Sequence, residues 1–183
     1  MFIQTEDTPN PSTIKFLPGK DVMKSGTADF TSFESTEKSP LARRIIEIEG
    51  VEGVFLGSDF ISVTKTKEQE WFSLKPSILG KIMEHYASGD NVLSVNKSEI
   101  TVSNEEDSEI VQQIKQLLDT RVRPAVAMDG GDIQFDSFDD GVVTLMMKGA
   151  CSGCPSSTAT LKMGIENMLR HYIPEVQEVR ASG

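Results

Sequence analysis

Two cysteines, Cys151 and Cys154, stand two residues apart and are the only thiols in a chain of 183 residues. A Cys-x-x-Cys segment brings two thiolates close enough to bind one metal ion or cluster. Gly149 and Gly153 free the backbone around the pair, so that N–H groups can turn toward the sulfurs. Pro155 suits the first position of a helix, which makes Cys154 the expected N-cap, and the helix dipole would then stabilise a thiolate. We therefore expect the pair to serve as ligands or nucleophiles rather than as small core residues.

Redox chemistry and zinc binding are two possible uses of this segment. A thioredoxin-like fold needs further strands and a cis-proline loop after its helix, whereas only residues 155–183 follow Cys154. A structural zinc site needs four ligands, and the only histidines are His85 and His171. His171 lies about 25 Å along the predicted helix from the cysteines, at roughly 1.5 Å per residue. We expect His171 to be a helix C-terminal residue favoured by the dipole, and His85 to occupy a surface position.

An iron–sulfur cluster is the third possible use, and it ordinarily takes four cysteine ligands. One chain cannot supply them, but two copies of the same loop facing each other across a two-fold axis can. The cluster would then be held between subunits, with an exposed edge. A cluster held in this way should be easier to give away than one enclosed by a single fold, so transfer by thiolate exchange becomes plausible.

Charge and composition limit the classes of partner and the cellular location that we expect for this protein. The formal net charge is -10 and the pI is near 4.7, which argues against nucleic acid and anionic membranes and favours basic partners. The chain has no run of the roughly 18 apolar residues that a membrane helix needs. The first residues also lack the pattern of a signal or transit peptide. We therefore expect a cytoplasmic protein in a bacterium, or a mitochondrial matrix protein if the chain is a processed mature form.

Hydrophobic periodicity predicts two α+β domains, 1–90 and 107–183, joined by a polar linker at 91–106. Each reads as helix, hairpin, helix, which predicts two small two-layer α/β sandwich-like domains. In the first half we expect a loose hairpin with a strand at 14–17, a helix from Pro40 to Gly50, strands at 51–56 and 60–64, and a helix at 75–87 with Ile78, Ile82, Met83 and Tyr86 on its apolar face.

The second half is predicted to place the cysteines between a hairpin and a helix. We expect a short strand at 100–102, an amphipathic helix at 110–122 that Pro124 kinks or restarts, strands at 133–137 and 142–147 around an Asp140-Gly141 turn, a helix carrying Leu161 to Tyr172, and an edge strand at 176–179. Asp129 and Asp132 flank two glycines and are interpreted as turn and cap residues rather than metal carboxylates. Trp71, Phe72, Met146 and Met147 are interpreted as core or domain-contact residues.

Two stretches of the sequence resemble a known family. The run Asp129-Gly130-Gly131-Asp132-Ile133, the hairpin after it and the run from Gly149 to Ser157 (GACSGCPSS) resemble the C-terminal domain of NifU and the Nfu proteins. The opening Thr8-Pro9-Asn10-Pro11-Ser12 with Lys15-Phe16 is similar to the N-terminal domain of Nfu proteins. Nothing matches the N-terminal scaffold or the ferredoxin-like part of full-length NifU, so the resemblance does not extend to a desulfurase-dependent scaffold role.

The resemblance implies an iron–sulfur cluster carrier and not an enzyme. It implies that Cys151 and Cys154 of two subunits bind one [4Fe-4S] cluster in a cluster-bridged homodimer. Such a protein takes the cluster from a scaffold or donor of the assembly pathway and passes it to apo iron–sulfur enzymes, with neither nucleic acid nor membrane as partner. A dithiol-disulfide oxidoreductase and a zinc-bridged interaction module remain the alternative hypotheses.

Overall fold

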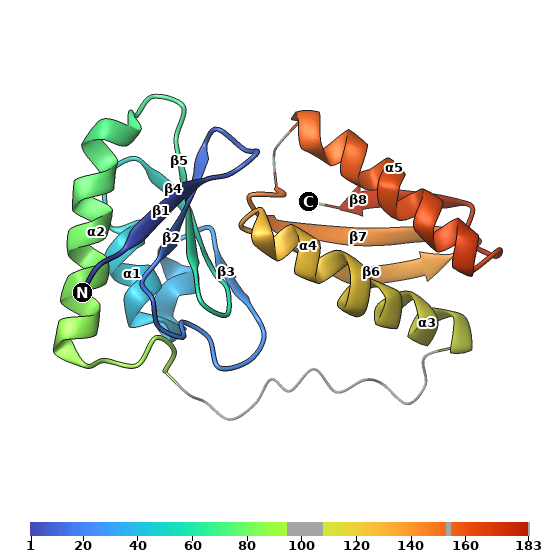
Figure 1. Ribbon diagram of the computed structural model, residues 1–183, viewed down its shortest axis with the longest axis horizontal. Helices are drawn as coiled ribbons and strands as arrows, with labels where there is room; N and C mark the ends of the chain where they lie inside the picture. The colour runs from blue at the N-terminus through green and yellow to red at the C-terminus, as the bar shows by residue number, and fades with distance from the viewer. Residues whose placement is uncertain (95–107, 153–154, 183) are drawn as a thin grey trace. The chain divides into compact units, whose positions relative to one another are not determined.

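The computed structural model describes residues 1–94, 108–152 and 155–182, with only the backbone described at 155–158. The chain divides into two compact units, Met1–Asn96 and Lys97–Gly183 (Figure 1). Each unit has its own sheet and its own hydrophobic core. Both are α+β, as the sequence predicts, with helices and sheet forming two layers. The predicted strand at 100–102 and most of the predicted linker lie outside the described residues.

Unit 1 is built on an antiparallel sheet with the strand order β1-β2-β5-β4-β3. The N-terminal hairpin pairs Gln4 with Leu17 and Asp7 with Ile14, which confirms the predicted hairpin. The strand β3 and a short 3-10 turn at Glu34–Lys38 were not predicted, because their Ser/Thr-rich sequence shows no clear period. The elements are β1 (Gln4–Asp7), β2 (Thr13–Leu17), β3 (Ala28–Phe30), α1 (Pro40–Ile46), β4 (Val51–Leu56), β5 (Ile61–Lys65) and α2 (Trp71–Ser88).

The start of α1 follows the predicted capping signal. The Ser39 hydroxyl accepts a hydrogen bond from the backbone N–H of Ala42 at 3.1 Å, and Pro40 stands at the first helical position. The helix ends at Ile46, earlier than predicted, and Gly50 follows in the left-handed region with φ 96°. Leu41, Ala42 and Ile45 are buried in the core of unit 1.

The buried face of α2 differs from the predicted one. The helix begins at Trp71, one turn before the predicted start, and buries Leu74, Ile78, Ile82 and His85. Met83, predicted to face the core, is 45% exposed. The prediction of Met83 was wrong because a histidine, read as polar, completes the buried stripe at the i, i+4, i+8, i+11 positions.

Unit 2 has three strands in the order β6-β7-β8, with all its helices over one face (Figure 1). The hairpin β6-β7 turns at Asp140-Gly141, where both residues have positive φ, as the sequence predicts. The edge strand β8 begins two residues later than predicted and runs parallel to β7. The elements are α3 (Glu109–Leu117), a π-turn (Leu118–Val122), α4 (Arg123–Met128), β6 (Gly131–Asp139), β7 (Val142–Gly149), α5 (Pro155–Tyr172) and β8 (Glu178–Ser182).

Pro124 explains the π-turn between α3 and α4. Proline lacks an N–H, and in a regular helix its ring would collide with the carbonyl of Thr120, four residues earlier. The chain inserts a wider turn instead, in which the Arg123 N–H donates to the Leu118 carbonyl. The predicted interruption at Pro124 is thus a local widening that keeps Leu118, Val122 and Val126 in the core of unit 2.

Candidate functional site

Cys151 lies directly after β7, at the end of the sheet of unit 2. Gly149 ends the strand with φ 63°, and Ser152 donates its backbone N–H to the Gly149 carbonyl at 3.1 Å. This tight turn directs Cys151 inward, where it is 6% exposed and belongs to the hydrophobic core. Within the described part of the chain Cys151 takes part in no disulfide. The turn therefore fixes one thiol at the boundary between strand and helix.

The Asp-Gly-Gly-Asp segment meets the cysteine loop in space. Gly131 and Gly149 are register partners across the β6-β7 pair, and Ala150 donates its backbone N–H to the Gly130 carbonyl at 3.2 Å. A β-carbon placed on Gly131 would lie 2.5 Å from the Cys151 sulfur and 2.9 Å from the Lys148 carbonyl oxygen. Only glycine therefore leaves room for the sulfur at this point. The two motifs that the sequence shows 20 residues apart form one site.

Asp132 is held by an arginine that sequence reasoning did not single out. Arg123 Nε and Nη2 donate to the two carboxylate oxygens of Asp132 at 2.9 and 3.0 Å, and the side chain of Asp132 is 4% exposed. Asp119 also accepts from Arg123, at 3.0 Å. The hydrogen bond to Asp132 raises the pKa of Arg123 above its ordinary value, although burial opposes the shift. The pair ties the start of α4 to the start of β6, whose register partner is the end of β7 before the cysteine loop.

Asp129 is a cap residue as predicted, whereas Asp132 is neither turn nor cap and lies in β6. Asp129 is the C-cap of α4, and its backbone N–H donates to the Val126 carbonyl at 3.1 Å. Asp132 is engaged by Arg123, and its Oδ1 also accepts from the Ile133 backbone N–H at 2.9 Å. A carboxylate held in this way is a structural anchor rather than an available metal ligand. In the sequence Arg123 is marked only by its position before Pro124, which does not indicate that it pairs with Asp132.

Cys154 lies outside the described residues, so its role as a ligand and as an N-cap stays a prediction. The helix that follows does begin at Pro155, as expected. No group of three or more His, Cys, Asp or Glu side chains suited to a metal ion is found among the residues whose placement is described.

The prediction that His85 is a surface residue was wrong. His85 is fully buried on α2, with its ring 5.6 Å from that of Tyr86, and neither ring nitrogen has a hydrogen-bond partner in the described structure. Burial lowers the pKa of His85, as does the positive charge of Arg44, while Asp90 acts in the opposite direction. His171 is exposed in the last turn of α5, which agrees with the prediction. Within unit 2, His171 lies at the end of α5 opposite to the cysteine loop.

The apolar residues singled out in the sequence have different environments. Met147 is buried in the core of unit 2, whereas its neighbour Met146 is 38% exposed. Trp71 packs against the core of unit 1 and donates its indole N–H to the Pro11 carbonyl at 3.0 Å. Phe72 is 92% exposed, so it is not a core residue, and the other half of its interpretation, a domain contact, stays a prediction. Successive side chains of a strand point to opposite faces, so Met147 is buried and Met146 is exposed. Phe72 is exposed because it lies on the face of α2 that points away from the core.

Comparison with known proteins gives matches over both units. A family model described as "Scaffold protein Nfu/NifU N terminal" matches residues 3–89, and one described as "NifU-like domain" matches residues 114–180. The human protein named "NFU1 iron-sulfur cluster scaffold homolog, mitochondrial" is 51% identical over 180 residues, which is 98% of this chain and 71% of that protein. "NifU-like protein 4, mitochondrial" of Arabidopsis thaliana is 53% identical over 98% of this chain and 65% of its own length.

Among solved structures, a NifU-like protein from Saccharomyces cerevisiae matches 51% of this chain and 85% of its own, with 29% identity and a TM-score of 0.47. Across the part of this chain that the structure describes, no helix is both long enough and apolar enough to cross a membrane.

Proposed function

This chain belongs to the Nfu/NifU family of iron–sulfur cluster scaffold proteins, and from that premise we propose that it carries a [4Fe-4S] cluster and delivers it to apo-proteins. The cluster is the cargo, held by Cys151 and Cys154 of two copies of the chain. The cluster would be received from a donor of the assembly pathway and released to apo iron–sulfur enzymes. The proposed role is therefore that of a carrier rather than that of an enzyme.

The observation that carries this proposal is the packing of Cys151 on Gly131. A β-carbon at Gly131 would come within 2.5 Å of the sulfur, so the position beside the thiol is kept free of side-chain atoms. The turn at Gly149 and the Ala150–Gly130 hydrogen bond hold the loop against β6. A thiolate suits iron well as a ligand, and a fixed loop lowers the entropic cost of binding it. The residues present thus fit a cysteine-ligated cluster.

The ligand count supports sharing of the cluster between two copies. The chain has two cysteines in total, and its two histidines lie in the core of unit 1 and at the end of α5. Asp132, the buried carboxylate nearest in sequence, is bonded to Arg123. Since a cubane cluster takes about four cysteine ligands, a second copy is the simplest source of the missing two.

Burial of Cys151 does not separate the carrier from the dithiol alternative, because a shared cluster and a substrate disulfide must both reach its sulfur. A disulfide oxidoreductase must present a nucleophilic sulfur to the disulfide of its substrate. Cys151 is 6% exposed and belongs to the core of unit 2.

The names of the human and plant relatives include the word mitochondrial, and of the two predicted locations we propose the mitochondrial matrix.

Anaerobic reconstitution with ferrous iron and sulfide tests the proposal. The wild-type protein should show the absorption and Mössbauer spectra of a [4Fe-4S] cluster and should activate an apo [4Fe-4S] enzyme. Cys151→Ala and Cys154→Ala should each abolish both. Zinc in the freshly purified protein with no cluster uptake would support the zinc module instead. Cluster-independent reduction of a protein disulfide would support the oxidoreductase.

A further inference from the structure

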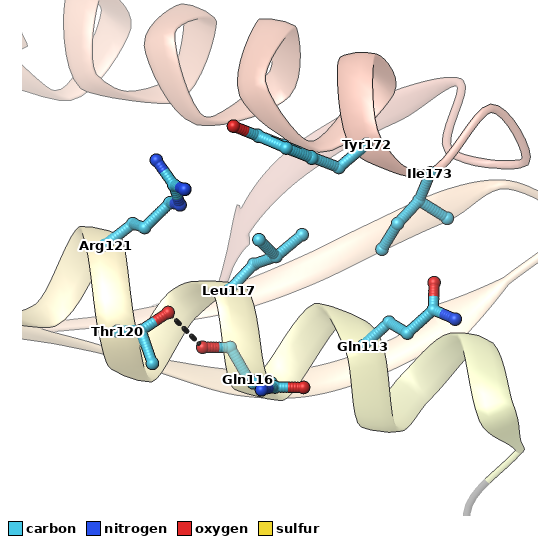
Figure 2. Close-up of a pocket in the computed structure, with 7 residues that line it drawn as sticks. All are labelled: Gln113, Gln116, Leu117, Thr120, Arg121, Tyr172 and Ile173. Carbon is cyan, nitrogen blue, oxygen red and sulfur yellow. Dashed lines mark hydrogen bonds between the residues drawn. The ribbon is translucent and has the colours of Figure 1, made fainter.

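A shallow groove in unit 2 lies between the α3/π-turn segment and the end of α5. Its volume is about 350 Å³, within the range of about 300–1,000 Å³ usual for ligand sites. Figure 2 shows Arg121 and Tyr172 on opposite walls, with Leu117 between the walls and Ile173 on the other side of Tyr172 from Arg121. Tyr172 closes α5 at the end farthest from the cysteine loop. The groove is therefore separate from the proposed cluster site.

Arg121 differs from every other arginine of this acidic chain. All six arginines lie in the described residues, and five of them form ion pairs with a carboxylate of the same chain. Arg121 is exposed, and in the described structure it makes no ion pair. Its guanidinium carbon instead lies 5.1 Å from the centre of the Tyr172 ring. The paired arginines are Arg43, Arg44, Arg123, Arg170 and Arg180.

Stacking on Tyr172 prepares Arg121 for a ligand. A guanidinium over an aromatic face is held by cation–π attraction, which leaves its N–H edge available for bidentate bonding to a carboxylate. Tyr172 is 48% exposed and its ring is also contacted at 5.1 Å by His171, so the ring is itself held in place. An arginine in this setting, in a chain of net charge -10, is a local positive site that an acidic group would complement.

The rest of the groove suits a peptide better than a simple anion. Leu117, which is partly buried, and the half-exposed ring of Tyr172 offer apolar surface beside the arginine, while Ile173 lies buried beneath them. Gln113 and Gln116 line the same groove, and their amides can both donate to and accept from a peptide backbone. The Thr120 hydroxyl is already used, since it donates to the Gln116 carbonyl at 2.7 Å (Figure 2). This combination matches an extended segment with an apolar side chain next to a carboxylate.

We propose that the groove between Arg121 and Tyr172 docks an acidic, partly apolar peptide segment of a partner protein. Arg121 binds the carboxylate of that segment, and the surface of Leu117 and Tyr172 receives its apolar side chain. Identification of the partner as a donor or acceptor of the cluster rests on the proposed function. Docking at the end of α5 leaves the cysteine loop available to a second copy.

Two libraries of capped heptapeptides test the docking site on the full-length ¹⁵N-labelled protein. One combines Asp and Glu with Leu, Ile and Phe, and the other replaces each acid by its amide. The acidic library should give saturable chemical-shift changes at Gln113, Thr120, Arg121 and Tyr172. Arg121→Gln should weaken binding about tenfold or more, because a charge-assisted bidentate contact is lost. Arg121→Lys should recover only part of the affinity.

Arg170→Gln provides the matched control, because it removes the same charge from an exposed position two residues before Tyr172 on α5. It should bind the acidic library as the wild-type protein does. Equal response to both libraries, no response at millimolar peptide, or undiminished binding by Arg121→Gln would overturn the proposal. Inorganic phosphate causing the same shifts would show a simple anion site and would also overturn it. Arg121→Gln should bind as much cluster as the wild type. Cluster loading therefore tests the proposed carrier function, and peptide binding tests the docking site independently of it.

Discussion

The sulfur of Cys151 occupies the space that a β-carbon on Gly131 would need, with only 2.5 Å between the two positions. The absence of a side chain at Gly131 thus leaves the space that the Cys151 thiol occupies. Hydrogen bonding between Ala150 and Gly130 fixes the two segments in register. The Asp-Gly-Gly-Asp run therefore packs against the cysteine loop and supports it, and we do not assign its carboxylates to a metal.

Replacement of Gly131 by alanine should damage both the stability of unit 2 and cluster uptake. The added methyl meets the Cys151 sulfur and also two backbone atoms that cannot turn away, so the loop must move. We expect a loss of about 1–3 kcal/mol in the free energy of unfolding, as for other overpacked sites. Urea unfolding and iron analysis of the reconstituted protein measure the two effects.

Gly164→Ala is the control for that substitution. Gly164 lies within α5, and a β-carbon there meets nothing within 4 Å. Since alanine favours a helix over glycine by about 1 kcal/mol, this variant should be as stable as the wild type or more stable, with full cluster uptake. Wild-type behaviour of Gly131→Ala would show that the loop does not depend on the glycine.

Asp132→Asn should destabilise unit 2, because it removes the buried one of the two carboxylates on Arg123, whose side chain is 32% exposed, and leaves only the exposed Asp119. Loss of one member of a buried ion pair costs about 3–5 kcal/mol, and retained hydrogen bonds place the asparagine variant at or below the lower end. Thermal and urea unfolding measure the loss. Glu178→Gln breaks the exposed pair with Arg180 and should leave the unfolding transition unchanged. Equal effects of the two variants would contradict a special role for Asp132.

Much of the fold follows from local signals in the sequence. Ser39-Pro40 starts α1, Asp140-Gly141 turns the β6-β7 hairpin, and Pro155 begins α5, each through backbone preferences of the residue itself. The meeting of Gly131 with Cys151 could not be foreseen, because it depends on the register of two strands. The Arg123–Asp132 pair has the same origin, since it joins a helix to the start of a strand.

His85 shows why an apolar pattern alone misplaced α2. The sequence pattern predicts Met83 and Tyr86 on the apolar face and His85 at the surface. Tyr86 does pack against the core of unit 1, whereas Met83 is 45% exposed and His85 is fully buried. Compared with the predicted orientation, α2 is rotated about its axis. Leu74 is the first residue of its buried face, and Phe72, two residues earlier, is 92% exposed. The helix follows the packing of its middle turns, Ile78 and Ile82, against the sheet and α1.

A pair of substitutions tests this register directly. Leu74→Ala removes a side chain that is 3% exposed and should lower the free energy of unfolding by about 2–5 kcal/mol. Phe72→Ala removes an exposed ring in the same turn and should change it by at most about 0.5 kcal/mol. Urea unfolding monitored by the fluorescence of the single Trp71 reports on unit 1. The opposite ranking of the two variants would show that α2 is rotated differently.

The stability of unit 1 should depend on pH through His85. Burial and then Arg44 lower its pKa in the folded state below the ordinary 6.5, so the unfolded chain binds the proton more readily. Stability contributed by the neutral ring is therefore complete above about pH 6.5 and is lost as the pH falls toward the folded-state pKa. His85→Leu should flatten the dependence of the unfolding free energy on pH in this window, whereas His171→Gln should retain it. An unchanged slope in His85→Leu would assign the effect to other groups.

Native mass spectrometry of the anaerobically reconstituted wild-type protein tests whether two chains share one cluster. We expect a species of two chains with about four iron and four sulfide, which falls to apo chains when Cys151 or Cys154 is replaced by alanine. A single chain that holds a complete cluster, or undiminished iron in Cys154→Ala, would contradict it.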